Sequence, residues 1–102
     1  MKIKTGDTVM VIAGKDKGKT GKVLFIDHAN KKLVVEGANI VTKHKKPQGP
    51  GMTGDRYTME APIDASNVMY YDEKNKKATR LGYRFEDGKK VRFMKSSDET
   101  IN

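Results

Sequence analysis

The stretch AGKDKGKTGKV, residues 13–23, combines glycines and lysines at a spacing that suits phosphate binding. Ala13, four further residues and then Gly18-Lys19-Thr20 fit a relaxed phosphate-loop pattern in which alanine replaces the first glycine. A nucleotide-binding phosphate loop opens directly into a helix, whose free N–H groups and dipole hold the phosphate. Here Thr20 is followed by GKVLFID, and glycine with β-branched and aromatic residues favours a strand. We therefore do not expect a nucleotide site.

The same stretch is better interpreted as a lysine-rich hairpin loop between two strands. Its glycines, Gly14, Gly18 and Gly21, let the chain reverse and bring backbone N–H groups close to a surface. Asp16 is short enough to cap or brace the turn. The alternative is a solvated turn whose lysines only add solubility. The excess of positive charge in residues 1–50 argues against that alternative. The lysines expected to contact the phosphates of a polynucleotide are Lys15, Lys17, Lys19 and Lys22.

Charge is distributed unevenly along the 102 residues, whose formal net charge is +8. Residues 1–50 contain eleven lysines and four acidic residues, whereas residues 51–102 contain ten basic and nine acidic residues. A polyanionic partner is therefore expected mainly for the first half, with nucleic acid favoured over membrane. No apolar run approaches the roughly 18 residues that a transmembrane helix needs. Without cysteine, a disulfide framework and thiolate metal sites are excluded.

The elements that must position these lysines are short strands. Apolar, often β-branched runs separated by turn residues predict an all-β chain with little or no long helix. Asp87-Gly88 predicts a tight hairpin turn, Glu73–Lys77 a polar turn, and residues 96–102 a mobile tail. The predicted strands are residues 8–13, 21–27, 32–36, 39–43, 56–60, 67–71, 78–85 and 90–95, and the predicted core is Val9, Val11, Val23, Phe25, Val35, Val68, Leu81, Phe85 and Val91.

Four segments together carry a family resemblance. GDTVMVIAGKDKGKTGKVLFID, residues 6–27, resembles the KOW motif of ribosomal proteins and transcription elongation factors. VEGANIVTKHKKP (35–47), EAPIDASNVMYYD (60–72) and RLGYRFEDGKKVRFMKSS (80–97) follow in the order typical of the bacterial large-subunit ribosomal protein twenty-four family. The KOW stretch alone is moderately specific, and the GYRFEDGKKVRF block makes the resemblance strong.

The resemblance implies an SH3-like barrel over residues 1–46, an exposed loop over 47–54 and a C-terminal β extension over 55–102 that packs on the barrel. It implies one structural domain, not an enzyme, in the cytoplasm within the ribosome. Its partners would be large-subunit ribosomal RNA near the 5′ end and neighbouring ribosomal proteins. The implied role is early organisation of subunit assembly close to the peptide-tunnel exit, where the Pro/Gly-rich segment Pro47–Gly54 would project.

Further RNA contacts are predicted outside the lysine-rich loop. Arg84 and Arg92 suit bidentate phosphate contacts, but ordinary pairing with Glu86 and Asp87 on the strand surface is an equal alternative. Tyr70 and Tyr71 could stack on bases, although one of them is expected in the core. The remaining predicted RNA-binding residues are Lys2, Lys4, Lys31, Lys32, Lys43, His44, Lys45, Lys46, Arg80, Tyr83, Lys89 and Lys90.

An alternative function is a KOW module that docks on protein, as in transcription elongation factors. It would require a second domain or an exposed apolar docking patch. An enzyme would require a convergent set of ionisable groups, and the spacing suggests none. With two histidines and no cysteine, no metal site or cofactor is expected. We expect no membrane, no small-molecule substrate and no homo-oligomer.

Overall fold

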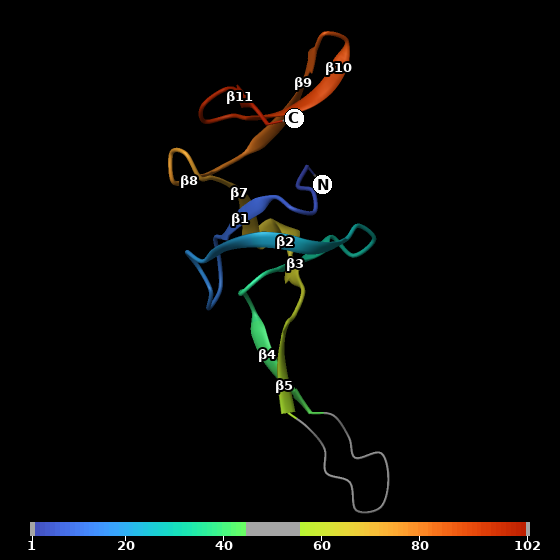
Figure 1. Cartoon of the computed structure of the whole chain (residues 1–102), viewed down its shortest axis with the longest axis vertical. Coiled ribbons are helices and arrows are strands. Elements are labelled where there is room, and N and C mark those ends of the chain that lie inside the picture. The colour runs from blue at the N-terminus through green and yellow to red at the C-terminus, as the bar shows by residue number, and fades with distance from the viewer. Residues whose placement is uncertain (1, 45–55, 102) are drawn as a thin grey trace, which may run out of the picture.

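The protein is built almost entirely from short strands. The structure, a computed structural model, describes residues 2–44 and 56–101, in which eleven strands and one 3-10 turn are found (Figure 1). The sequence of these residues is rich in β-branched runs ended by glycine, asparagine and aspartate, which is typical of strands joined by tight turns. The all-β prediction is therefore confirmed.

Six strands form the central sheet, in the order β6-β3-β2-β1-β7-β8, and every adjacent pair is antiparallel. The expected barrel is not closed by strand pairing in the described residues, because β6 is two residues long and pairs only with β3. The 3-10 turn η1 instead carries the chain round from β6 to β7. The elements are β1 Thr8–Val11, β2 Thr20–Asp27, β3 Lys32–Val35, β6 Ile63–Asp64, η1 Ala65–Asn67, β7 Val68–Asp72 and β8 Lys77–Thr79.

The core lies inside the curve of this sheet. Alternate residues of β1 and β3 face inward, and Val9, Leu33 and Val35 are completely buried. Ile63 and Val68, one on each side of η1, reach the same cluster. The core predictions for Val9, Val11, Val23, Val35, Val68 and Leu81 are confirmed, whereas Leu33 was not predicted.

A β-bulge explains why the core prediction for Phe25 is wrong. The register of β2 against β3 shifts between Val23, which faces Val35, and Phe25, which faces Val34. The extra residue Leu24 breaks the alternation that the sequence suggested. Leu24 is 45% exposed and Phe25 is 62% exposed.

A second sheet is a hairpin that projects from the central body. Strand β4 (Ile40–His44) pairs with β5 (Arg56–Glu60) from Ile40 opposite Glu60 to His44 opposite Arg56. Ile40, Tyr57 and Met59 are exposed on this hairpin. The predicted Pro47–Gly54 loop lies outside the described residues.

The third sheet has the order β11-β10-β9 and is built from the end of the chain. Strands β9 (Leu81–Glu86) and β10 (Lys89–Met94) are joined by Asp87-Gly88, and both turn residues have positive φ, as a type I′ turn requires. This turn prediction is confirmed. The expected mobile tail is wrong in its described part, because β11 (Glu99–Thr100) pairs with β10.

In the part of the chain that the structure describes, no second layer covers the outer half of the β9–β10 hairpin. The core predictions for Phe85 and Val91 are therefore wrong: Phe85 is 73% exposed and Val91 is only half-buried. The two hairpins extend from opposite ends of the central sheet, and the molecule measures 64 × 27 × 20 Å (Figure 1).

Candidate nucleic-acid interface

The lysine loop, defined here as Gly14–Lys19, is an ordered turn between β1 and β2. Val11 N–H donates to Lys19 O at 2.8 Å, and Gly18 N–H donates back to Val11 O at 2.8 Å. Within the turn, Lys17 N–H donates to Gly14 O at 3.2 Å. The loop therefore continues the β1–β2 ladder, which gives its lysines a fixed base.

Asp16 braces this loop, as the sequence suggested. One carboxylate oxygen accepts the Asn39 backbone N–H at 2.6 Å, and the other lies 3.0 Å from the Lys19 ammonium group. The hydrogen bond from Lys19, followed by that from the Asn39 backbone, lowers the pKa of Asp16 below its ordinary value of 3.8. The loop is thereby tied to the turn that precedes β4.

The other lysines at this end of the sheet remain available to a partner. Lys15, Lys17 and Lys22 are exposed, and none of them forms an ion pair with another described residue. Lys19, by contrast, is neutralised by Asp16. Three uncompensated cations therefore stand on one braced turn and the strand that follows it.

Two of the predicted glycines act differently from the third. Gly14 and Gly18 have φ values of +88° and +96°, which the loop backbone requires and other residues rarely adopt. At Gly21, a Cβ atom would lie 2.3 Å from the Glu36 carbonyl oxygen. Gly21 is therefore needed for the close approach of β2 to the chain after β3, inside the protein.

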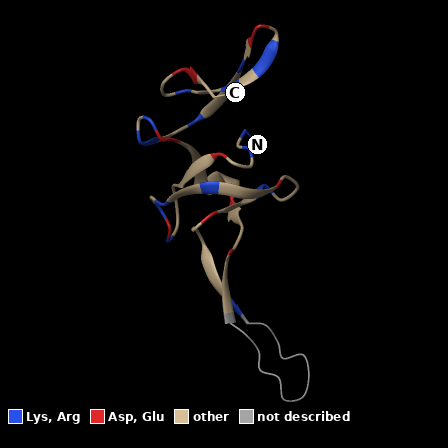
Figure 2. Ribbon diagram, in the orientation of Figure 1, with Lys and Arg blue, Asp and Glu red and all other residues tan. Residues whose placement is uncertain are grey.

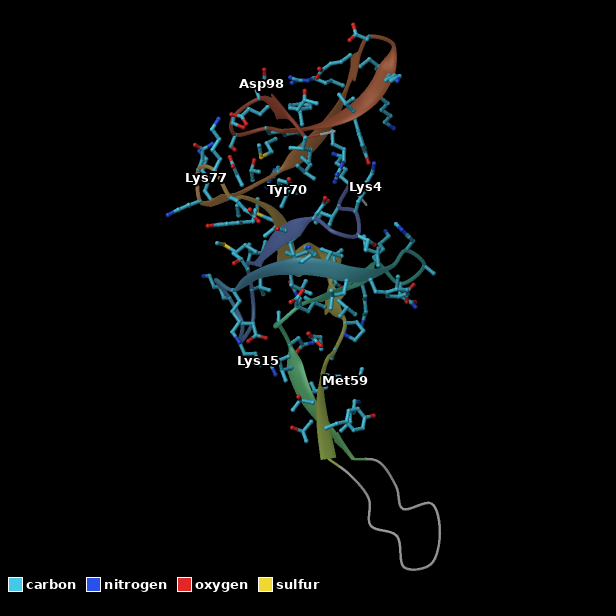
Figure 3. The ribbon with its side chains drawn as sticks, viewed as in Figure 1. Lys4, Lys15, Met59, Tyr70, Lys77 and Asp98 are labelled. Atoms are coloured by element: carbon cyan, nitrogen blue, oxygen red, sulfur yellow. The ribbon has the colours of Figure 1, made fainter. Side chains whose placement is uncertain are left out.

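The remaining cations of the first half spread over the molecule (Figure 2). Lys31 and Lys32 lie at the β2–β3 turn, and Lys2 and Lys4 lie in the segment before β1; all four are exposed. Lys4 and Lys15 lie on different sides of the central sheet (Figure 3). Lys43 is exposed on β4, His44 ends that strand, and Lys45 and Lys46 lie outside the described residues.

The two arginines predicted as phosphate contacts both pair with other residues of the protein. Arg92 is 5% exposed, and its guanidinium bonds both Asp7 oxygens, at 2.6 and 3.2 Å. It also donates to Lys2 O at 2.9 Å. Arg92 is thus buried and ion-paired with Asp7, and it fastens the C-terminal sheet to the start of the chain.

Arg84 likewise follows the alternative of surface pairing. Its three nitrogens donate to Glu86 at 2.9 Å, to the Asp98 carboxylate and backbone at 2.9 and 2.8 Å, and to Thr100 at 2.7 Å. The guanidinium also lies 4.7 Å from the centre of the Phe93 ring. The expected partner Glu86 is found, and Asp98 takes the place of Asp87. Because all three guanidinium nitrogens of Arg84 already donate to protein acceptors, a bidentate phosphate contact would require some of these hydrogen bonds to break.

Tyr83, Lys90 and Lys2 gather near the seam between the C-terminal sheet and the N-terminal segment. The ammonium nitrogens of Lys90 and Lys2 lie 4.2 and 5.8 Å from the centre of the Tyr83 ring. Lys89 is exposed at the start of β10, and Arg80 is exposed before β9. A first group of predicted residues thus lies at the lysine loop and a second group at this seam, while others, such as Lys31, Lys32 and Lys43, lie elsewhere.

Lys95 belongs to the second group and was missed in the sequence. Its backbone N–H donates to Arg80 O at 2.9 Å, directly beyond the pair formed by Leu81 and Met94. The Asp87-Gly88 turn fixes this register, so the turn signal could have placed Lys95 opposite Arg80.

The described residues contain no cluster of three or more His, Asp or Glu that could hold a metal ion. They also contain no helix with the length and apolar character that a bilayer crossing requires.

Comparison with known proteins adds independent information on both halves of the chain. Residues 5–36 match the KOW motif, and residues 38–101 match the family described as "Large ribosomal subunit protein uL24, C-terminal domain". A protein of Finegoldia magna named "Large ribosomal subunit protein uL24" is 68% identical over 99% of both chains. Proteins of the same name from Picosynechococcus and Alkaliphilus oremlandii are 53% and 51% identical over the whole of this chain, covering 89% and 100% of their own lengths.

Proposed function

The chain belongs to the uL24 family of large ribosomal subunit proteins, and from this premise we propose that it binds large-subunit ribosomal RNA near the 5′ end of that RNA. It is a ribosomal protein, cytoplasmic within the ribosome, and its family is not a class of enzymes. The proposed role is early organisation of subunit assembly, at a position close to the exit of the peptide tunnel. Neighbouring ribosomal proteins would be its other partners.

The observation that carries RNA binding is the set of free cations on the lysine loop and on β2 directly after it. Lys15, Lys17 and Lys22 are exposed and lack ion pairs within the described residues. A lysine that is not neutralised internally releases counterions when it meets a phosphate, and this release drives association with nucleic acid. The bracing of the loop by Asp16 lowers the ordering cost of that contact.

Recognition would depend on phosphate position and RNA shape more than on base edges. The deep groove of an RNA helix is closed to side chains, so phosphates and 2′-hydroxyls present the accessible groups. Lysine suits this task because its ammonium is a mobile point charge. The lysine loop would therefore bind where several RNA phosphates have the right spacing, as expected for an organiser of folded RNA.

The first test replaces Lys15, Lys17 and Lys22 together by alanine. Binding to a transcript of the 5′ region of large-subunit RNA is measured over a series of salt concentrations. The salt slope should fall by about one unit for each lost phosphate contact, so about three units in all. The matched control replaces Lys74, Lys76 and Lys77, which lie at the β7–β8 turn and remove the same charge.

If the salt dependence of RNA binding is unchanged in the triple lysine variant, these lysines do not contact RNA phosphates. A sucrose gradient of lysate after a high-salt wash provides a second measurement. A tagged chain that sediments with the large subunit supports the proposal, whereas a chain at the top of the gradient or with RNA polymerase contradicts it.

The alternative of a transcription-type module requires a second domain or an exposed apolar docking patch, and Leu24 and Phe25 are exposed apolar residues at the bulge of β2. The match of residues 38–101 to the ribosomal family favours a different use of these two residues. We propose that they face a neighbouring ribosomal protein.

A further inference from the structure

A cavity of about 390 Å³ lies at the seam between the central sheet and the C-terminal sheet. The lining is mixed, and its apolar part, called the floor here, is formed by Ile3, Val68 and Leu81 from the N-terminal segment, β7 and β9. Tyr70, which also lines it, projects from the central body toward the C-terminal sheet (Figure 3). The volume falls within the range of about 300–1,000 Å³ typical of small-molecule sites.

Three cations stand around this apolar floor: Lys2, Arg80 and Lys95. All three are exposed, and none forms an ion pair with another described residue. Elsewhere in the C-terminal sheet the protein neutralises its arginines, Arg84 with Glu86 and Asp98 and Arg92 with Asp7. Unlike these two arginines, the three cations next to the cavity are not neutralised by a carboxylate of the described residues.

Arg80 and Lys95 face each other directly across the start of β9 and the end of β10, since Lys95 N–H donates to Arg80 O. Like charges at directly opposed positions of a sheet are destabilising. An anion bound between them would remove this repulsion, so the arrangement indicates a negatively charged ligand.

The third cation is held in place by an internal contact. Arg92 donates to Lys2 O at 2.9 Å while its own charge is balanced by Asp7. The backbone of Lys2 is therefore fixed beside the cavity by a guanidinium that does not itself compete for an anion. Arg92 is a positioning residue for this site.

We propose that the cavity receives one unpaired nucleotide of a bound RNA strand. The base lies against Ile3, Val68 and Leu81, and the phosphate lies among the ammonium and guanidinium groups of Lys2, Arg80 and Lys95. The proposal deepens the function proposed above and rests on it. It assigns the second group of cations a separate task, the capture of an extruded nucleotide, whereas the lysine loop contacts backbone phosphates.

Two further features suit a nucleotide. Burial, with a smaller contribution from the Asp7 charge, raises the pKa of Tyr70 above 10.0, so its hydroxyl stays protonated and available as a donor. An apolar floor with cations at its edge matches the two ends of a nucleotide, an uncharged ring system and a phosphate. Inorganic phosphate would leave the floor empty.

The test is a methyl and amide NMR titration of the full chain with AMP, adenosine and inorganic phosphate in parallel. AMP should shift the methyl signals of Ile3, Val68 and Leu81 and the amide signals of Arg80 and Lys95. Adenosine and phosphate alone should shift the same methyls at least fivefold less at equal concentration. The trinucleotide ApApA should bind at least as tightly as AMP, because the proposed ligand is part of a strand.

Two double variants give the matched comparison. Arg80→Ser with Lys95→Ser should weaken AMP binding at least fivefold, whereas Lys76→Ser with Lys77→Ser should leave it unchanged. Both pairs remove two exposed cations, and only the first lines the cavity. Unchanged core methyl signals without ligand show that the variants are folded. If the first variant does not fold, the single change Lys95→Gln replaces it, with an expected loss of at least twofold.

Several outcomes would overturn the inference. One is a set of shifts confined to the lysine loop, and another is an equal response of the floor methyls to phosphate alone. Tighter binding of AMP than of ApApA would indicate a free nucleotide. An acidic peptide that shifts the floor methyls as strongly as AMP would indicate a protein partner.

The lysine-loop variant separates this inference from the proposed function. It should lose affinity for the RNA transcript while its AMP shifts persist. If the wild-type chain binds the transcript but AMP does not shift the floor methyls, only the proposal for the cavity is wrong. If the wild-type chain does not bind the transcript, the proposed function is wrong.

Discussion

Arg92 joins parts of the chain that lie far apart in sequence. Its guanidinium bonds Asp7 and the backbone of Lys2 while it is 5% exposed. Asp7 in turn accepts the Lys4 backbone N–H at 2.7 Å, which completes a small network. Removing one partner of such a buried pair leaves the other charge without compensation, which is more costly than losing the pair's attraction alone.

We expect Arg92→Ala to lower the free energy of unfolding by about 3–5 kcal/mol. Chemical denaturation measures this change, with Asp7→Ala as the second single variant and the double variant completing a thermodynamic cycle. The double variant should lose clearly less than the sum of the two single losses. Additive losses would contradict the coupling, and Arg80→Ala, at an exposed position, should stay within about 0.5 kcal/mol of the wild type.

The roles of individual residues are harder to predict from the sequence than the positions of the strands. The lysines of the loop are exposed as expected, because a short glycine-rich turn has no packed surface in which a charged side chain could be buried. Arg92 has the same chemistry as an RNA-contacting arginine in the sequence, and only its distant partner Asp7 decides its role. Phe25 is similar, since one extra residue in β2 reverses the face on which it lies.

Two connecting turns are built in the same way. Asp27 and Asp72 each end a strand and bond an asparagine three residues later, Asn30 and Asn75. In both turns the following lysine has a positive φ of 54°. The recurrent pattern Asp-x-x-Asn-Lys therefore specifies the turn, because the Asp carboxylate accepts hydrogen bonds from turn N–H groups that would otherwise need a backbone acceptor.

Asp72 gives this turn a dependence on pH. Its carboxylate accepts hydrogen bonds from the side chain and backbone of Asn75 and the backbone of Lys74, and the first of these is the main cause that lowers its pKa below 3.8. A lowered pKa in the folded state stabilises the fold above 3.8, and this contribution is lost as the pH falls below that value. Asp16, Asp27, Asp64 and Glu86 also have lowered pKa values, so their effects have the same sign.

We therefore expect the melting temperature to change little between pH 5 and 7 and to fall steeply below about pH 4. Asp72→Asn should lower stability at pH 7 and make the acid decline shallower. The control is Asp87→Asn, an exposed turn carboxylate with no hydrogen bond to another described residue. An equally steep decline in the Asp72 variant would contradict the assignment.

Most strands were predictable because turn residues separate them clearly. The predicted range 56–60 coincides with β5, 32–36 is one residue longer than β3, and 39–43 is displaced by one residue from β4. The short strands β6 and β11 were not predicted, because two residues cannot show an alternating pattern and depend entirely on their partners β3 and β10.

The whole molecule is more extended than its length suggests. Its Cα radius of gyration is 17.5 Å, whereas about 13 Å is usual for a compact domain of about 100 residues. The cause is the two hairpins that project from opposite ends of a small central sheet (Figure 1). Their outer residues include exposed Tyr57, Met59 and Phe85, which a compact fold would bury.

Small-angle X-ray scattering of the free chain should give a radius of gyration of about 17 Å or more, clearly above the compact value. A Gly88→Ala variant, strained at the β9–β10 turn by its φ of +77°, provides a comparison for the C-terminal arm. Its scattering should stay extended while its stability falls by about 1–2 kcal/mol. A measured radius near 13 Å would mean that the hairpins fold back onto the central sheet.

If the chain binds ribosomal RNA as proposed, the opposed hairpins would also constrain the order of assembly. A slender protein with an arm at each end could not enter a finished RNA fold sideways without opening that fold. It would have to bind while the surrounding RNA strands are still loose, so that they close over it. Shape alone would then make the protein hard to exchange once installed, and its departure would depend on the rate at which the RNA unfolds around the arms.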